Sequence, residues 1–552
     1  PGRRRPEPAA AHTRVAVARG LERVGACCYR RQLETAIAFC TGGLFTVSVP
    51  SSRVVITYLG LMWHSQERDA GLVVGCVLPP LVFLSRLQAQ VHFKEENVDT
   101  SLLYAWLSIS VGFGVIIKLW LFQSTALVPS LVVDALVLPV VFQLGGLESD
   151  DRFVLASVGR ITVSAVFAYG MKGLPRSFTV GEGLLVAQGV SFAIIDVVLA
   201  SIQRLSEMEL VGLPDSALHA WHLSAAALTR DDHVLALLVG VLGSFLVCAA
   251  LSPILRAYGA ASPTIVAPRL PLKPTATFAI IAGAVIVLVV YPWSCVLLST
   301  WNPFAWLVDF LLERAVRLQL IAAWVVCLVV LVPLFAVISE RWALRNIIAR
   351  KLFHLLVVVM FVPAYFLDVP LLVLSYGVAL AVFCLVECVR AVSLPPVGHV
   401  IASFMKAFID HREAGRVILT HTYLLLGCAL PLWLAAPQAT NALAANAGVI
   451  ALGVGDAMGA VVGSSIGKRK LFGNKTVEGT AAILLSMVLA SLVFEDYHVR
   501  FFDGAYVEVL IFLASIVLTG ALEAATAQID NLVLPLFFFV VCNLTTCHGP
   551  VN

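Results

Sequence analysis

Charged residues are scarce in this chain of 552 residues: they make up 13% of it, against about 25% in a typical soluble domain. Hydrophobic residues make up 60%, and the mean hydropathy is +0.93. The sequence has no internal repeat and no polar stretch of a size that indicates an extramembrane domain. A net charge of +3 is too small to indicate nucleic acid binding. The composition predicts a polytopic membrane protein.

Two common functional motifs are also missing. None of the 12 cysteines forms a CxxC pair or a Cys/His spacing typical of zinc sites, so we expect small apolar core residues without a redox role. The phosphate-binding pattern GxxxxGK[ST] does not occur, because the run from Gly463 to Arg469 is one residue short and no strand precedes it. Any bound nucleotide is therefore held by membrane helices and their loops.

Apolar runs fill most of the sequence, and several are shorter than the ~20 residues expected of a membrane span. They lie at 33–50, 71–88, 102–123, 126–145, 153–171, 183–202, 233–255, 276–299, 319–338, 352–367, 371–389, 417–436, 443–463, 479–494, 506–522 and 532–545. We predict an all-α fold, a polytopic transmembrane helical bundle of roughly 15 spans.

The chain divides into three predicted regions. Residues 1–32 form a basic N-terminal tail, 33–340 an N-terminal multi-span membrane region, and 341–552 a C-terminal polytopic region with the polar loop 464–478. If each run from 352 onward spans once, twelve Lys and Arg residues lie in the loops on one side and only Arg500 on the other. The positive-inside rule then places the polar loops in the cytoplasm.

Four charged residues fall within apolar runs of the first half: Lys118, Asp134, Arg160 and Asp196. Charges at such depth are usually functional or paired, and an Asp134–Arg160 pair is one expectation. A transporter with these residues along its path is an alternative function. The absence of related halves and the clustering of charged motifs at one face argue against it.

The stretch from residue 455 to 480 holds the strongest motif. Gly455, Gly459, Gly463 and Gly467 recur at intervals of four, which is typical of close helix packing. Asp456 lies beside this stripe, deep in an apolar run, where an unpaired carboxylate is costly. A metal ion, a reacting hydroxyl or a structural partner such as Arg390 would explain it.

The loop after the glycine stripe is rich in cations and leads into another helix. We expect Thr476 to cap that helix and Glu478 to lie in its first turn. A helix N-terminus beside Lys475 is suited to an anion such as phosphate, although lysines that merely fix the topology are the simpler reading.

Two more polar groups face the same predicted side. Residues 350–354 open one span, and acids and cations surround the loop 390–416. Between the last two spans lie Glu523, Gln528, Asp530 and Asn531. We predict that these loops and the glycine motif form one composite site for a phosphate-bearing ligand.

Four stretches in order resemble the dolichol kinases of the polyprenol kinase family: 349–372, 387–434, 454–480 with its GNKTVEGT element, and 522–536. The resemblance covers roughly 200 residues and implies a polytopic kinase region at 341–552. It implies a CTP-dependent enzyme of the endoplasmic reticulum membrane that phosphorylates the terminal hydroxyl of dolichol, with CTP as the donor and a divalent metal, Mg²⁺, at its site. The product supports protein glycosylation.

The resemblance also implies the site residues. The CTP-binding stretch of the family maps onto 464–478, where the family often has two adjacent lysines and this chain has Asn474-Lys475. The nucleotide-binding candidates are Ser464, Ser465, Gly467, Lys468, Arg469, Lys470, Gly473, Asn474, Lys475, Thr476 and Glu478. Asp456 and Glu478 are the candidate metal ligands, and Asp456, Asp530 and His354 the candidate catalytic residues. Alternative functions within the enzyme class are a kinase for phytol or another polyprenol and a cytidylyltransferase like CDP-diacylglycerol synthase.

Overall fold

The computed structural model describes residues 71–92, 98–122, 137, 150–174, 177–208, 231–259, 274–391, 393–406, 417–435, 441–471, 475–494, 506–526 and 530–546. Within these ranges the fold is all-α, and the only β feature is a single bridge between Lys470 and Thr476. The helices up to residue 312 are α3 (Leu72–His92), α4 (Val98–Phe122), α6 (Asp150–Gly173), α7 (Val180–Glu207), α10 (Asp232–Gly259), α11 (Pro274–Val285), η1 (Ile286–Val290), α12 (Tyr291–Leu297) and α13 (Pro303–Leu312). Those that follow are α14 (Ala315–Arg341), α15 (Asn346–Leu367), α16 (Val369–Ala391), α17 (Gly398–Lys406), α18 (Thr420–Leu434), α19 (Ala442–Ala445), η2 (Val449–Asp456), α20 (Ala457–Ser465), α21 (Val477–Ser491), α23 (Tyr506–Ala525) and α24 (Asp530–Thr546).

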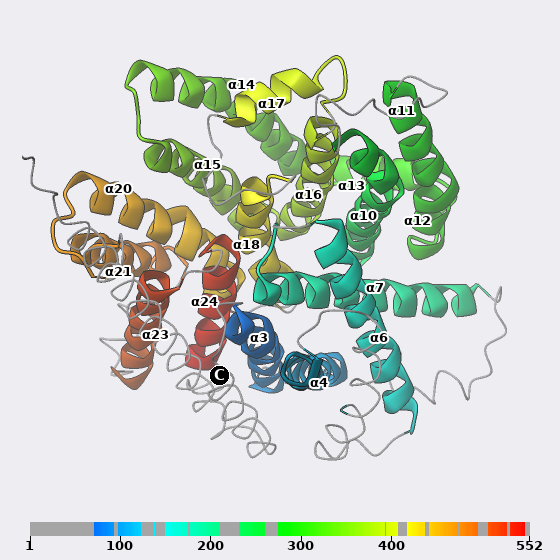
Figure 1. Cartoon of the computed structure of the whole chain (residues 1–552), viewed down its shortest axis with the longest axis horizontal. Coiled ribbons are helices and arrows are strands. Elements are labelled where there is room, and N and C mark those ends of the chain that lie inside the picture. The colour runs from blue at the N-terminus through cyan, green and yellow to red at the C-terminus, as the bar shows by residue number, and fades with distance from the viewer. Residues whose placement is uncertain are drawn as a thin grey trace, which may run out of the picture.

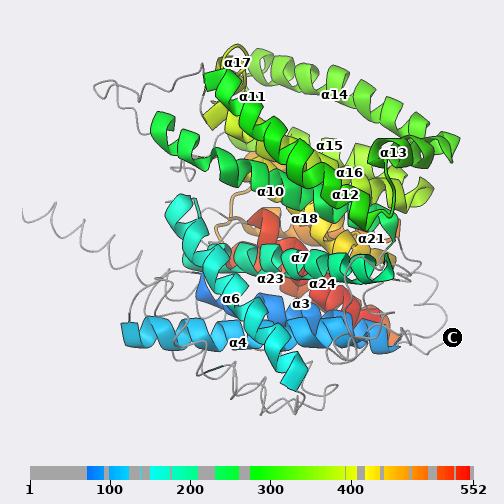
Figure 2. The same ribbon diagram turned by 90° about the vertical axis from the view of Figure 1, so that its right-hand side faces the viewer.

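Most of these helices run roughly parallel to one another, with α14 along one edge of the bundle and α4 along the opposite edge (Figure 2). Seven described helices are long and apolar enough to cross a membrane, and shorter apolar helices accompany them. The predicted helical membrane fold is thereby confirmed in class, while the count of roughly 15 spans stays a prediction. The runs at 33–50 and, apart from residue 137, at 126–145 lie outside the described residues.

Two helices were not expected from the sequence. The helix α13 is short and presents Phe304 and Leu312, both more than 60% exposed, and α17 spans only nine residues. Both are too short to produce the long apolar run by which a span is recognised. The predicted run 443–463 is also not one regular helix, because it divides into α19, the π-helix η2 and α20.

The glycine stripe packs against α21. A Cβ atom on Gly455 would approach Met487 to 2.8 Å, and one on Gly463 would lie 3.1 Å from the hydroxyl of Thr476. Glycine at these positions therefore lets η2 and α20 lie directly against α21, as small-residue stripes do in membrane helices. The helices α20 and α21 lie side by side at the left of Figure 1, next to α23 and α15.

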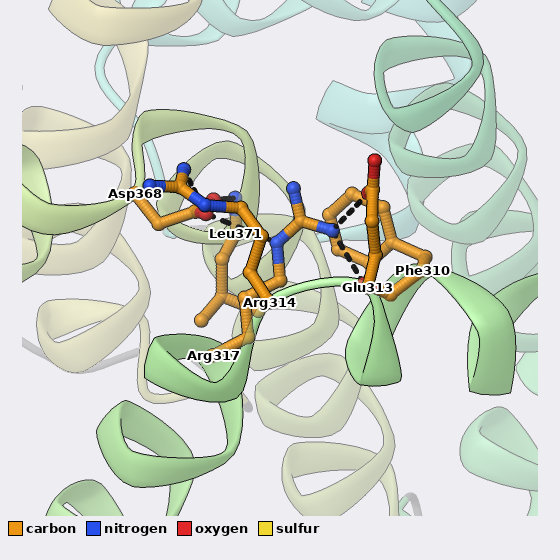
Figure 3. A network of polar contacts seen from close by, with 6 residues as sticks. All are labelled: Phe310, Glu313, Arg314, Arg317, Asp368 and Leu371. Atoms are coloured by element: carbon orange, nitrogen blue, oxygen red, sulfur yellow. Dashed lines mark hydrogen bonds and ion pairs between the residues drawn. The ribbon is translucent and has the colours of Figure 1, made fainter.

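A network of ion pairs lies at the turn between α15 and α16, around the buried carboxylate of Asp368 (Figure 3). The carboxylate of Asp368, between α15 and α16, has no exposed area and accepts hydrogen bonds from Arg314 at 2.7 Å and Arg317 at 3.0 Å. It also accepts the N–H of Leu371 at 2.9 Å and so caps α16. Arg317 bonds to Glu313 at 2.8 Å in addition. The network ties α13 and α14 to the turn between α15 and α16.

Replacing Asp368 by alanine is expected to lower the free energy of unfolding by about 3–5 kcal/mol, because the buried guanidinium of Arg317 loses its buried carboxylate partner and keeps only the exposed Glu313. Arg314 is half-exposed, so Arg314→Ala should cost about 1 kcal/mol or less. Thermal unfolding of the detergent-solubilised chain measures both variants. Equal midpoints for Asp368→Ala and Arg314→Ala would contradict this reading.

In the first half, Asp196 accepts a hydrogen bond from the hydroxyl of Tyr104, which accounts for one of the deep charges. Arg160 is buried, with 3% of its surface exposed. The expected Asp134–Arg160 pair cannot be placed, because Asp134 lies outside the described residues, as do the side-chain surroundings of Lys118.

Candidate active site

Lys351, His354 and Asp456 come together where α15 meets η2. The ammonium of Lys351 bonds to Oδ2 of Asp456, and both side chains are almost completely buried, with 12% and 8% exposed. His354 Nδ1 lies 2.8 Å from the carbonyl oxygen of Leu452 and 3.8 Å from Asp456 Oδ2. Because a carbonyl only accepts hydrogen bonds, Nδ1 carries the proton, and Nε2 is the acceptor of the neutral ring. Asp456 ends a π-helix, a rare geometry that often marks functional sites.

A second group joins Lys475 to the last two helices. Its ammonium bonds to the carboxylate of Glu523, near the end of α23, and lies 3.6 Å from Asp530 Oδ2, at the start of α24. The Glu523 side chain is 5% exposed, whereas Lys475 and Asp530 are partly exposed. Burial disfavours the ammonium, but Asp530, Glu523 and Asp456 outweigh that effect and raise the pKa of Lys475 above its usual value. Lys475 is therefore charged at neutral pH.

The two groups form one site. Asp456 and Lys475 interact electrostatically, so the carboxylates of Asp456, Glu523 and Asp530 and the ammonium groups of Lys351 and Lys475 share one region. The five residues lie near the start of α15, at the end of η2, just before α21, near the end of α23 and at the start of α24, and their ion pairs bring these positions together. Three of the polar segments that the sequence predicted to form one composite site therefore lie together, and a phosphate-bearing ligand there stays a prediction.

The loop between α20 and α21 is folded back on itself. Leu471 N–H donates to Lys475 O, and Val477 N–H to Arg469 O, both at 2.9 Å. Glu478 accepts the backbone N–H groups of Lys468 at 3.1 Å and Arg469 at 3.2 Å. These bonds hold the described parts of the loop in a hairpin-like turn.

The ends of the loop are also fixed. Arg345 donates to the carbonyl oxygen of Ser464 at 3.1 Å, which joins the loop to the start of α15. Thr476 caps α21 by accepting the N–H of Gly479 at 3.2 Å, and Glu478 lies in the first turn, as the sequence predicted. The N–H groups that bond to Glu478 lower its pKa and keep it ionised.

The other predicted nucleotide-binding residues are distributed along this loop. The side chains of Lys468, Arg469 and Lys470 are exposed, Ser465 is exposed, and Ser464 donates to Val461 O at 3.2 Å. Gly467 packs against Thr476, where a Cβ atom would come within 2.9 Å of its methyl group. Gly473 and Asn474 lie outside the described residues.

The expected metal ligands do not meet in the described part of the chain. Asp456 contacts Lys351 and His354, while Glu478 contacts the loop backbone. Among the described residues no group of three or more His, Cys, Asp and Glu side chains is placed to hold a metal ion. Their role as a metal pair stays a prediction.

The structure also corrects the partner considered for Asp456. Arg390 bonds to Glu387 at 2.6 and 2.7 Å on α16, and the salt bridge of Asp456 is made with Lys351. Glu387 further accepts the N–H of Ile418 at 2.5 Å, and the ring of His421 packs edge-on against Phe353. The polar residues around 387–421 therefore support α15 and α18, while 407–416 lie outside the described residues.

Sequence reasoning placed Lys351 and Glu523 in polar clusters without giving either a role. Lys351 is the partner of Asp456, 105 residues away, and Glu523 the partner of Lys475, 48 residues away. Helical periodicity reveals only neighbours three or four residues apart. The remaining signal was their position at the ends of apolar runs on the motif's side.

Comparisons with known proteins identify relatives of this chain. A family model described as dolichol kinase matches residues 227–467. The chain is 39% identical over 241 residues to "Dolichol kinase EVAN" of Arabidopsis thaliana, a match that covers 43% of this chain and 42% of that protein. It is 33% identical over 387 residues to "Dolichol kinase" of Homo sapiens (67% and 65%) and 29% identical over 250 residues to that of Saccharomyces cerevisiae (44% and 46%).

No solved structure matches the chain. In these alignments the chain spans between 42% and 65% of the length of the curated relatives it matches. The family match ends at residue 467, so Lys351 and Asp456 lie within it, whereas the group of Lys475, Glu523 and Asp530 lies beyond it. The chain is a relative of the dolichol kinases.

Proposed function

We propose that this protein is a CTP-dependent dolichol kinase, which transfers the γ-phosphoryl group of CTP to the terminal hydroxyl of dolichol. The observation that carries the proposal is the meeting of Lys351, Asp456, Lys475, Glu523 and Asp530 at one end of an apolar helical bundle. Phosphoryl transfer mainly requires positioning and neutralisation of charge, and these groups supply both. The relation to dolichol kinases supports dolichol as the acceptor, and CTP as the donor is part of the proposal.

The triphosphate is assigned to the loop 464–478. Lys475 is charged and partly exposed, and the exposed side chains of Lys468, Arg469 and Lys470 lie on the same turn. Charge-assisted hydrogen bonds from such groups to phosphate oxygens are stronger than neutral ones. The start of α21 adds backbone N–H groups and a favourable dipole. Ser464, Ser465, Gly467, Gly473, Asn474, Thr476 and Glu478 complete the proposed binding loop.

Asp456 is the proposed acceptor of the dolichol proton. The nine-residue helix α20 separates Asp456 from the start of the loop 464–478, which corresponds to about 13 Å along the helix. We therefore place Asp456 deeper in the membrane than this loop and nearer the lipid. Its two described contacts use Oδ2, which leaves Oδ1 for a hydroxyl or a metal ion. Lys351 neutralises the carboxylate, and His354 and Asp530 are the other candidates for this role. General-base assistance to an alcohol is worth about 10²–10⁴-fold.

A divalent cation, Mg²⁺, accompanies the nucleotide in this proposal. The carboxylate oxygens of Asp456 and Glu478 are ligands of the kind that Mg²⁺ prefers, and because the two side chains have different neighbours, one of them would hold the cation together with phosphate oxygens. When bound, the cation would supply further neutralisation of the phosphate charge.

The location of the enzyme is proposed as the endoplasmic reticulum membrane, with the site facing the cytoplasm. Support comes from the twelve-to-one bias of basic residues and from the convergence of two of the basic segments, around Arg345 and Lys475, with the acidic segment that holds Glu523. All five ion-pair residues fall within 341–552, which supports placing the chemistry in that region.

This proposal is tested with membranes that contain the chain. They receive CTP labelled at either the α- or the γ-phosphate, together with dolichol, phytol or phosphatidic acid as the acceptor. The proposal expects γ-label in dolichyl phosphate and no α-label in lipid. Transfer of γ-label to phytol alone would identify a different polyprenol kinase. Incorporation of α-label from CTP into phosphatidic acid, with release of pyrophosphate, would identify a cytidylyltransferase.

A further inference from the structure

Glu523 has no role in the proposed chemistry, yet it makes the main contact of the proposed phosphate-binding lysine. The carboxylate receives the ammonium of Lys475 and has only 5% of its side chain exposed. It projects from the last turn of α23, a helix that contributes no other residue to the ion-pair groups. The ion pair therefore joins the loop 464–478, which connects α20 and α21, to the neighbouring helix pair α23 and α24.

The burial of Glu523 makes this contact hard to replace. A carboxylate removed from water is stabilised only by a close cation and hydrogen bonds, and separating such a pair is costly. Asp530 lies 3.6 Å from the same ammonium, but 25% of its side chain is exposed, so water stabilises part of its charge. Glu523 therefore holds the lysine more firmly than Asp530 does.

The contact also fixes the backbone beside the lysine. The carbonyl of Lys475 accepts the N–H of Leu471 at 2.9 Å, and Thr476, the next residue, caps α21. The position of the ammonium, the returning arm of the loop and the start of α21 are thus set together. The chain has one lysine before Thr476 rather than two, so no adjacent lysine duplicates this position.

We propose that Glu523 is a positioning residue for the nucleotide, which acts by holding Lys475 and the adjoining loop in the geometry that receives the triphosphate. This inference rests on the proposed function for the identity of the nucleotide. Glu523 does not touch the reacting atoms, so its effect lies on nucleotide binding more than on the chemical step.

Glu523→Gln is the variant that tests the inference, because it removes the charge and nearly preserves the shape. We expect the KM for CTP to rise about tenfold or more while kcat at saturating CTP stays within about threefold of wild type. Glu523→Asp retains the charge on a shorter side chain and should give an intermediate KM. Glu340→Gln, an exposed acid at the end of α14, is the matched control and should leave both parameters unchanged.

Binding of labelled CTP to the purified chain provides a readout that does not require transfer to dolichol. Glu523→Gln should weaken binding in the wild-type background and have no further effect in a Lys475→Met background, since it acts through that lysine. Failure of the proposed function would remove dolichol phosphorylation and leave this binding pattern testable.

Three results would overturn the inference. One is unchanged CTP binding in Glu523→Gln. Another is an equal loss with and without Lys475, which would show an independent contact. The third is a fall in kcat with a shifted Mg²⁺ requirement at an unchanged CTP affinity, which would make Glu523 a metal ligand. If Glu523→Gln unfolds, as its thermal midpoint would show, Glu523→Asp decides, and a wild-type KM would refute the role.

Discussion

Lys475→Met is expected to reduce phosphoryl transfer to dolichol by about 100- to 1,000-fold, the loss typical when one preorganised charge at a developing anion is removed. The ammonium is the only described cation that contacts both Glu523 and Asp530, and it also interacts with Asp456. Methionine keeps an unbranched chain of similar length but cannot neutralise phosphate. Both kcat and the affinity for CTP should fall, measured with γ-labelled CTP and purified chain.

The variant also leaves the buried carboxylate of Glu523 without its partner, so folding must be checked separately. The double variant Lys475→Met with Glu523→Gln removes both charges and should regain stability without regaining activity. Lys172→Met, at an exposed lysine in the last turn of α6, is the matched control. Wild-type transfer by a folded Lys475→Met protein would remove Lys475 from the site.

Asp456→Asn is expected to lower kcat by about 10²–10⁴-fold, which is the usual contribution of a general base. Asparagine preserves the shape of the side chain but cannot accept the hydroxyl proton or neutralise Lys351. Since Asp456 lies below the nucleotide loop, the KM for CTP should change much less than kcat. Rates at saturating CTP and saturating dolichol separate the two parameters.

The matched control for this variant is Asp309→Asn, an exposed acid on α13 at the opposite end of the bundle. It should behave as wild type. A folded Asp456→Asn protein with unchanged kcat and a much higher KM for CTP would contradict the assignment, because Asp456 would then act in nucleotide binding.

The sequence predicted the helices well because long apolar runs report membrane helices directly. The runs at 71–88, 183–202, 352–367 and 371–389 correspond to α3, α7, α15 and α16. The cap at Thr476 was likewise predictable, since it depends on residues three apart. The π-helical geometry of η2, which packs against α15 and α21, was not predictable, because apolar composition does not distinguish a π-helix from an α-helix.

The site was predictable in its residue types and less so in its pairs. Asp456 and His354 were recognised as candidates within apolar runs, and Lys475 and Asp530 beside such runs. Their partners depend on which helix ends meet, and many arrangements of so many helices satisfy the same hydropathy pattern. Arg390 was considered for Asp456 for that reason, whereas the structure places Lys351 there.

The proposed transfer of the γ-phosphoryl group from CTP to dolichol is tested by the stoichiometry of the reaction that the purified wild-type chain carries out. Purified chain receives CTP labelled in its γ-phosphate together with dolichol and Mg²⁺, and dolichyl phosphate and CDP are counted in the same sample. One CDP is expected for each dolichyl phosphate formed. Release of pyrophosphate, or the absence of label in dolichol from a folded chain that binds CTP, would contradict it.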